Sequence, residues 1–218
     1  MSSKSHRTSR TSRRSAKLTA LVAAAFGAVA LAVSAPAAMA DTACQTRSTS
    51  TAFSFVGDWN RYFAAPDGSF DRSDNWYDYG SRLVDGVGSP ANAANGSYTR
   101  SAFIPGYSSM TSAWSCVYGN EDTVRLLLKP NGNSAGALKL YVYTSNPNSI
   151  KGWSVKTISI DPTTAGTPVG SGWYVTPRIS IPWTPYWDNT QWVSLSFSTQ
   201  TSSGWYVDDV MIDPWRSN

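Results

Sequence analysis

Apolar and polar residues alternate with a period of two along the C-terminal half of the chain. Residues 124–129, 138–143 and 192–198 follow this pattern most clearly. A period of two is typical of a strand that buries one face and exposes the other. The apolar positions, which we expect to point inward, are Val124, Leu126 and Leu128, then Leu138, Leu140 and Val142, and finally Val193, Leu195 and Phe197.

Further strands are predicted over residues 155–160, 175–181 and 205–212, and shorter ones over 81–84 and 98–104. Short segments rich in Pro, Gly, Asn and Ser separate them, and no stretch shows a sustained helical period. Many short strands joined by such turns predict an all-β protein with a single antiparallel jelly-roll β-sandwich.

Residues 1–40 have the three parts of a secretory signal peptide. A basic segment precedes the apolar run Leu18–Val33, and the small residues Ala38-Met39-Ala40 follow it. This order predicts a cleaved signal and leaves residues 41–218 as the sandwich domain of a secreted, extracellular protein. An uncleaved anchor is the alternative, and Arg13-Arg14 leaves a twin-arginine route open. No later stretch is apolar enough to predict a membrane span.

The charge balance changes sign once residues 1–40 are set aside. They hold six of the 18 basic residues and no acidic one, so 12 basic and 14 acidic side chains remain. The single histidine, His6, lies there too, and Glu121 is the single glutamate. These counts exclude a histidine-dependent nucleophile, a histidine metal site, a two-glutamate glycosidase pair and the basic excess that nucleic-acid binding needs.

Two cysteines, Cys44 and Cys116, remain after the signal peptide. In an oxidising compartment they most simply pair with each other. The bridge would tie the start of the domain to its middle. Two free or intermolecular thiols are the competing interpretation.

Two segments carry a family resemblance. Residues 66–76 read PDGSFDRSDNW, and residues 204–212 read GWYVDDVMI. Together they resemble the ends of the jelly-roll domains of calcium-containing carbohydrate-binding modules, with a galactose-binding-like β-sandwich. Asp71 stands where those modules usually have Glu, and Asn75 where they have Gly. The layout is also similar to that of small actinobacterial secreted jelly-roll proteins, whose pattern is matched here by Phe53, Gly57, Asp58, Cys116, Val117 and the final Asp-Asp-Val.

The resemblance implies a structural calcium ion held by Asp71 and Asp208, with backbone carbonyls completing the six to eight oxygens that calcium takes. The alternative is that Asp208 pairs with Arg72 or Arg216, or accepts backbone hydrogen bonds. On a regular strand, Asp208 and Asp209 would point to opposite faces.

Aromatic side chains are abundant, and 27 of the 28 follow residue 40. Most belong in the core, but some fall on the polar phase of a strand or in a polar loop. Flat rings beside polar groups suit the apolar faces and hydroxyl rims of sugars. The alternative is that these rings cover the sheet beneath long loops. The candidate ligand-binding residues are Lys139, Tyr141, Tyr143 and Trp192 on strands, and Trp183, Tyr186 and Trp187 in the loop 181–189.

These observations favour a secreted, non-catalytic module that binds polysaccharide. One alternative is a structural protein of the cell envelope or matrix, whose surface aromatics contact other proteins. Another is a small polysaccharide lyase or hydrolase, because Tyr with Arg or Lys can act as acid and base without histidine. The residues that would serve such an enzyme are Lys139, Tyr141, Tyr143 and Arg125.

Overall fold

The computed structural model describes Cys44 and residues 47–71, 75–90, 100–132, 135–146, 153–183 and 190–213. The chain divides into two units, Met1–Ser34 and Ala35–Asn218, and every described residue belongs to the second. The predicted signal peptide therefore lies outside the described residues. Within the described part, no helix has the length and apolar character needed to cross a membrane.

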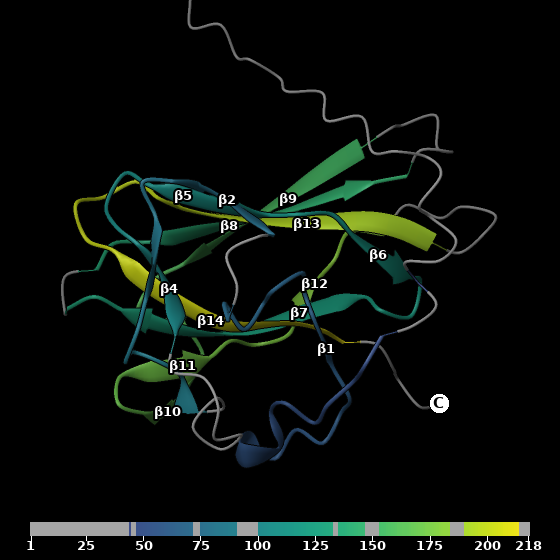
Figure 1. The fold of residues 1–218 in the computed structure, drawn as a ribbon, viewed down its shortest axis with the longest axis horizontal. Coiled ribbons are helices and arrows are strands. Elements are labelled where there is room, and N and C mark those ends of the chain that lie inside the picture. The colour runs from purple at the N-terminus through teal and green to yellow at the C-terminus, as the bar shows by residue number, and fades with distance from the viewer. Residues whose placement is uncertain are drawn as a thin grey trace, which may run out of the picture. The chain divides into compact units, whose positions relative to one another are not determined.

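The strands of the second unit form two antiparallel sheets, which lie as two layers in Figure 1. The eight-stranded sheet has the order β10-β11-β7-β14-β4-β3, with β1 also paired to β14 and β12 to β7. The six-stranded sheet has the order β2-β5-β13-β8-β9, with β6 also paired to β13. We call them the larger and the smaller sheet. The predicted all-β sandwich is confirmed.

The strand bounds agree with most of the predicted ranges. The larger sheet contains β1 (Phe63–Ala64), β3 (Arg82–Val84), β4 (Ser101–Ile104), β7 (Thr123–Pro130), β10 (Thr167–Gly170), β11 (Trp173–Val175), β12 (Ile179–Ser180) and β14 (Trp205–Asp213). The smaller sheet contains β2 (Trp76–Tyr79), β5 (Ser109–Ser112), β6 (Ser115–Tyr118), β8 (Leu138–Ser145), β9 (Trp153–Ile160) and β13 (Thr190–Thr199).

The connections between the sheets have the pattern of a jelly roll. The chain crosses from one sheet to the other between β4 and β5, between β7 and β8, and between β13 and β14. As a result β14 lies between β4 and β7, while β13 lies between β5 and β8. Such interleaving of early and late strands is typical of jelly rolls.

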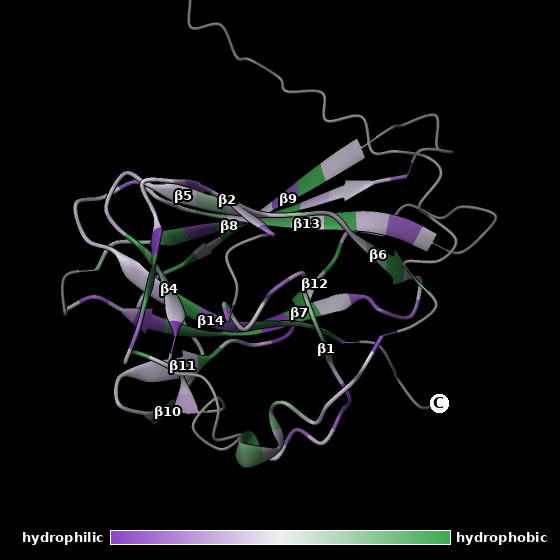
Figure 2. Ribbon diagram, viewed as in Figure 1, coloured by the Kyte–Doolittle hydropathy of each residue, from purple (hydrophilic) through white to green (hydrophobic). Residues whose placement is uncertain are grey.

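The main core lies between the two sheets and uses the predicted alternating positions. All nine predicted inward residues are buried, with exposed fractions of 0–1%. Trp205 and Phe70 join the same cluster. Figure 2 shows the apolar segment at the centre of β13 that contributes to this layer. Replacing one such leucine with alanine would cost about 2–5 kcal/mol, because the close-packed layer cannot fill the cavity.

A second, smaller core lies on the outer face of the larger sheet. Residues 50–62, which we call the covering segment, pack there and include the short 3-10 helix η2 (Ser54–Val56). An antiparallel bridge between Ser50 and Tyr62 closes the segment. The buried residues of this second core are Phe53, Tyr62, Leu127, Trp173, Val175 and Met211.

The covering segment explains why residues 126–128 are all apolar. Leu126 and Leu128 face the main core, while Leu127 faces the covering segment. A strand buried on both faces needs apolar side chains at consecutive positions rather than at every second one. The outer face of β7 is therefore buried at Leu127, while Arg125 and Lys129 on the same face stay partly exposed.

The predicted strand over residues 175–181 is instead two short strands. Both β11 and β12 pair with β7, and the chain between them contains Pro177. Thr176 bridges the interruption: its backbone N–H donates to the carbonyl of Leu126, and its hydroxyl accepts the N–H of Leu126. The proline, which has no N–H to donate, ends the regular ladder.

The predicted disulfide between Cys44 and Cys116 is confirmed, with their Cα atoms 5.3 Å apart. Arg47 reinforces the same junction. Its guanidinium donates to the carbonyls of Cys116 (2.9 Å) and Cys44 (3.2 Å) and forms an ion pair with Glu121 at 2.9 Å. Burial raises the pKa of Glu121, against the opposing effects of the Tyr118 N–H and Arg47. The single glutamate is thus part of a structural network.

Candidate functional site

The outer face of the smaller sheet carries side chains that range from exposed, such as Tyr77, Tyr79 and Trp153, to buried, such as Ser194 and Ser196. The strand registers identify which residues share it, because successive residues of a strand alternate between faces. One rung runs Tyr77–Thr111–Ser196–Tyr141–Thr157, and the next runs Tyr79–Ser109–Ser198–Lys139–Ser159. We call this surface the open face; Ser194, Tyr143, Val155, Trp192, Ser145 and Trp153 also belong to it.

Two pairs of tyrosines border the middle of the open face. Tyr77 and Tyr79 on β2 are 73% and 75% exposed, which leaves their rings free for a ligand. Tyr141 and Tyr143 on β8 are half-buried, and their rings stack with centroids 6.2 Å apart at an angle of 20°. Burial and the neighbouring Tyr141 raise the pKa of Tyr143, so its hydroxyl keeps its proton at neutral pH.

Small hydroxyl side chains lie between the two tyrosine pairs. They come from β5 and β13, the two strands that separate β2 from β8. Three strand spacings place the two tyrosine pairs about 14 Å apart at the backbone. Thr111 and Ser196 hydrogen-bond each other at 2.7 Å. Ser194 and Ser196 face outward as predicted but are buried, because larger side chains flank them.

The far edge of the open face lies on β9. Trp153 is 68% exposed and Val155 44% exposed. Lys139 donates from its ammonium group to the hydroxyl of Ser159 at 3.1 Å and adds a positive charge to the face. The sequence analysis did not single out Trp153, Tyr77 or Tyr79. Their alternation with the inward-facing residues of the same strand could have indicated that they face outward. β2, however, is too short for this alternation to be recognised.

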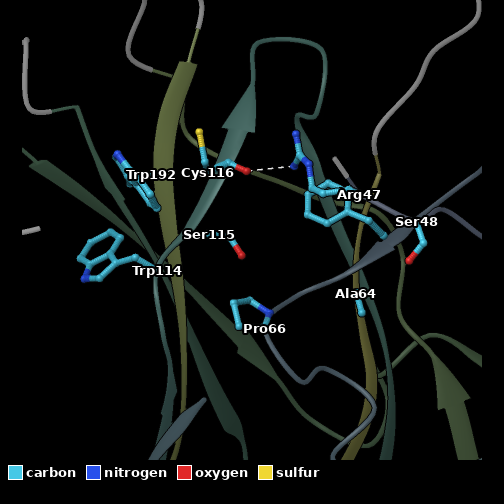
Figure 3. A pocket seen from close by; sticks show the side chains of 9 residues that line it. Arg47, Ser48, Ala64, Pro66, Trp114, Ser115, Cys116 and Trp192 are labelled. Atoms are coloured by element: carbon cyan, nitrogen blue, oxygen red, sulfur yellow. Dashed lines mark hydrogen bonds between the residues drawn. The ribbon is translucent and has the colours of Figure 1, made fainter. Parts of the chain in front are cut away.

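A pocket of about 380 Å³ adjoins the open face at Trp192. Figure 3 shows Trp114 and Trp192 on one side of this pocket and Arg47 and Ser48 on the other. The guanidinium of Arg47 is held by the carbonyl of Cys116 and by its other partners. Its residues are Arg47, Ser48, Phe63, Ala64, Pro66, Trp114, Ser115, Cys116 and Trp192.

The predicted loop candidates do not join the open face in the described structure. Trp183 is partly buried and packs against the main core. Tyr186 and Trp187 lie outside the described residues. The strand candidates Lys139, Tyr141, Tyr143 and Trp192, by contrast, share one face of one sheet.

Asp208 and Asp209 do not point to opposite faces, as a regular strand would require. The register of β14 against β7 shifts between Asp208 and Met211, and Asp209 has a positive φ of 45°. This bulge brings both carboxylates to Ser89: its N–H donates to Asp208 at 2.9 Å, and its hydroxyl donates to Asp209. Asp208 also accepts the N–H of Asp209 at 2.8 Å. Asp208 therefore makes the backbone hydrogen bonds that were one of the alternatives; the other, a pairing with Arg72 or Arg216, lies outside the described residues.

Asp71 lies close enough to this pair to act on its charge. Burial and, to a smaller extent, the charge of Asp71 raise the pKa of Asp209 to about 6, against the opposing hydrogen bond from Ser89. Burial and the charge of Asp209 raise the pKa of Asp208 well above its ordinary value. One buried oxygen of Asp71, Oδ1, has no hydrogen-bond partner among the residues that the structure describes. Among the described residues, no group of three or more acidic, Cys or His side chains is arranged around a metal position.

A second polar cluster joins the covering segment to the larger sheet. Asp58 accepts hydrogen bonds from the Tyr62 hydroxyl (2.5 Å) and the Asn60 side chain (2.6 Å), and pairs with Arg125 and Arg178. Burial alone would raise the pKa of Asp58, but hydrogen bonds from the Tyr62 hydroxyl and the Asn60 backbone N–H, together with the two arginines, lower it overall. Burial and Asp58 raise the pKa of Tyr62 to about 12. The charged and polar groups around Asp58 therefore pair with one another, as in a structural ion-pair network.

Comparisons with known proteins find similar structures but no sequence relatives. No family model matches the chain, and no curated protein does. The similar solved structures include a family 61 carbohydrate-binding module in complex with β-1,4-galactotriose (10% identity, TM-score 0.40, 68% of this chain and 96% of that chain). They also include a family 28 module specific for non-crystalline cellulose (18% identity, TM-score 0.43, 69% of this chain and 94% of that chain).

A further similar structure is the family 11 carbohydrate-binding module of a cellulosomal cellulase from Clostridium thermocellum. It shares 13% identity at a TM-score of 0.38, over 69% of this chain and 94% of that chain. Function must be argued from the side chains.

Proposed function

We propose that the protein is a secreted, non-catalytic module that binds polysaccharide along the open face of the smaller sheet. The observation that carries this proposal is the arrangement of Tyr77, Tyr79, Tyr141 and Tyr143 on either side of a band of serine and threonine hydroxyls. The disulfide supports export, since such bonds persist in oxidising compartments.

The chemistry of the open face matches a sugar chain. Aromatic rings stack on the apolar C–H faces of sugars, and the hydroxyls between them can exchange hydrogen bonds with the sugar rim. The rings stand on strands of one sheet, so binding costs little ordering of the protein. Trp153, Trp192 and the adjoining pocket would extend the contact beyond the tyrosines.

The acidic groups favour binding over catalysis. Asp58 lies in the ion-pair network beneath the covering segment, Glu121 in the junction at Arg47, and Asp208 and Asp209 at the bulge of β14. None of these four shares a strand rung with the tyrosines of the open face. An acid–base pair for glycosidic cleavage would need to flank the bound chain.

Retention on insoluble polysaccharides tests the proposal directly. Tyr79→Ala and Tyr141→Ala should each weaken binding by about 2 kcal/mol, or about 30-fold, as aromatic hot spots do. Trp59→Ala is the matched control, because Trp59 is 73% exposed but belongs to the covering segment on the larger sheet. If both tyrosine variants and Trp59→Ala were all retained like the wild type, the open face would be ruled out as the binding site.

We further propose that the acidic cluster at the bulge of β14 binds a structural calcium ion. Asp71 and Asp208 were the expected ligands; Asp209 shares Ser89 with Asp208 and is affected by the charge of Asp71. The unpaired oxygen of Asp71 and the charge repulsion among these carboxylates support a cation there. Backbone carbonyls would have to supply most of the remaining oxygens.

A further inference from the structure

The four strands at the ends of the two sheets differ in how well they resist pairing with another chain. β3 has three residues, and β2 and β10 have four each. β10 also contains Pro168 and a register shift between Pro168 and Gly170. Short strands, prolines and bulges are the devices by which proteins protect sheet edges. Three of the four ends therefore carry ordinary protection.

β9, the fourth end, lacks these devices. It has eight residues without proline or glycine, and it pairs in unbroken register with β8 over its full length. Every second residue of such an edge strand directs its N–H and C=O groups away from its neighbour. The side chains do not compensate, because Trp153 and Val155 are exposed apolar residues.

The single charged residue of β9 is engaged elsewhere. The ammonium group of Lys156 donates to the carbonyl oxygen (3.1 Å) and to the hydroxyl of Ser180 in the other sheet. A lysine that guards a sheet edge must project its charge toward an approaching strand. Lys156 instead closes the side of the sandwich, so β9 presents a long, neutral and regular edge.

We propose that β9 pairs antiparallel with β9 of a second copy of this chain, about a two-fold axis. Two-fold pairing satisfies both edges with the same contacts, as is usual for homodimers. A second copy of the chain is a suitable partner for this edge. Apart from Lys156, β9 carries no charge that would be repelled by the same strand of the second copy. The proposal does not depend on polysaccharide binding.

The alternation of side chains limits the register of this pairing. Residues directly opposite each other must share a face, so the sum of their numbers must be even. Centring the pair on Lys156 would place two ammonium-bearing residues opposite each other, which is unfavourable. The next register places Thr157 opposite Thr157 of the second copy, and Val155 opposite its Ser159.

The geometry has a consequence for the open face. A two-fold axis perpendicular to the sheet leaves both open faces on the same side. β8, β9 and their copies then follow one another, so the two Tyr141 backbones stand three strand spacings apart, about 14 Å. If the proposed function holds, one polysaccharide chain can contact both copies and gain from the higher effective concentration of the second site.

Sedimentation of the purified full-length secreted protein, without polysaccharide, tests the pairing. We expect the mass of two chains for the wild type and of one chain for Thr157→Lys, which places two lysines opposite each other. Thr167→Lys is the matched control, because Thr167 is an exposed residue of the short edge strand β10; it should remain a dimer. A monomeric wild type, or a dimer that survives Thr157→Lys, would overturn the proposal.

Cysteine cross-linking tests the register separately. Under mild oxidation, Thr157→Cys should form a disulfide-linked dimer, whereas Val155→Cys should not, because Val155 faces Ser159 of the second copy. Cross-linking of Val155→Cys in preference to Thr157→Cys would overturn the register. A wild type that sediments as one chain and is still retained on polysaccharide would overturn the dimer while leaving the proposed function standing.

Discussion

The two outer faces of the sandwich differ in their exposure to solvent. The face of the larger sheet is buried under the covering segment, where Phe53, Tyr62 and Trp173 form a second core. The face of the smaller sheet leaves Tyr77 and Tyr79 about three-quarters exposed. Both faces are rich in aromatic rings, so aromatic content alone does not mark a binding surface. What distinguishes them is whether the chain supplies its own cover.

Charge follows the same division. On the covered face, Asp58, Arg125 and Arg178 neutralise one another beside the second core. On the open face, serine and threonine hydroxyls predominate, with Lys139 as a positive charge. Buried charges require partners, whereas exposed hydroxyls are free to bind a neutral ligand. The covered face therefore contributes to stability, and the open face is the one for which we propose recognition.

Removing a ring from the covered face should have the largest effect on stability. Trp173 is 1% exposed in the second core, so Trp173→Ala should cost about 3–5 kcal/mol of unfolding free energy. Denaturant unfolding measures this loss. The folded fraction should still bind polysaccharide normally, and a selective loss of binding would contradict the division between the faces.

Breaking the charge network of the covered face should cost somewhat less. Asp58→Asn leaves Arg125 partly buried without its carboxylate and should destabilise the protein by about 3 kcal/mol. The pKa of Asp58 is lowered on folding, so its stabilisation is present above the ordinary aspartate pKa. It should be lost as the pH falls through the folded-state value. A variant whose acid unfolding matched that of the wild type would show that the network adds nothing.

Calcium should stabilise the metal-stripped protein by about 2.7 kcal/mol at a hundredfold excess over its Kd. Asp209→Asn should abolish this gain. In chelator, the same substitution should raise the melting temperature at pH 7, because it removes a charge whose folded-state pKa is raised to about 6. If calcium still stabilised the Asp209→Asn variant, the ion would bind elsewhere. If calcium did not stabilise the wild type, the calcium site would be ruled out.

The acidic cluster also predicts the direction of a pH effect. A carboxyl group whose pKa is raised on folding stabilises the protein below its unfolded pKa, and this contribution is lost as the pH rises through the folded pKa. In chelator, acidification from about pH 6 toward pH 4 should therefore favour the wild type relative to Asp209→Asn. An equal response of the two proteins would show that Asp209 titrates normally.

The sequence predicted the parts of the fold that depend on repeated patterns. β7, β8, β13 and β14 each span eight or more residues, enough for their periodicity to show. The pairing of Cys44 with Cys116 followed from counting two cysteines in an exported chain. The open face was found in part, because Tyr141, Tyr143 and Trp192 lie on long alternating strands.

The remainder depends on contacts that leave no local signal. Tyr77 and Tyr79 lie on a four-residue strand, too short for a period to be measured. The bulge at Asp209 adds a residue and reverses the phase, so the face of Asp208 cannot be deduced from alternation. Trp183 looked like an exposed loop residue but packs against the main core. The covering segment packs on only one of the two sheets, and this depends on tertiary contacts rather than on a local sequence pattern.

Mapping a soluble oligosaccharide onto the backbone amides by NMR tests the central claim most directly. The oligosaccharide should come from a polysaccharide that retains the protein. The account predicts chemical-shift changes concentrated on β2, β5, β13, β8 and β9, with the covering segment and β11 unaffected. Changes concentrated on the covering segment or β11, with the open face silent, would contradict it.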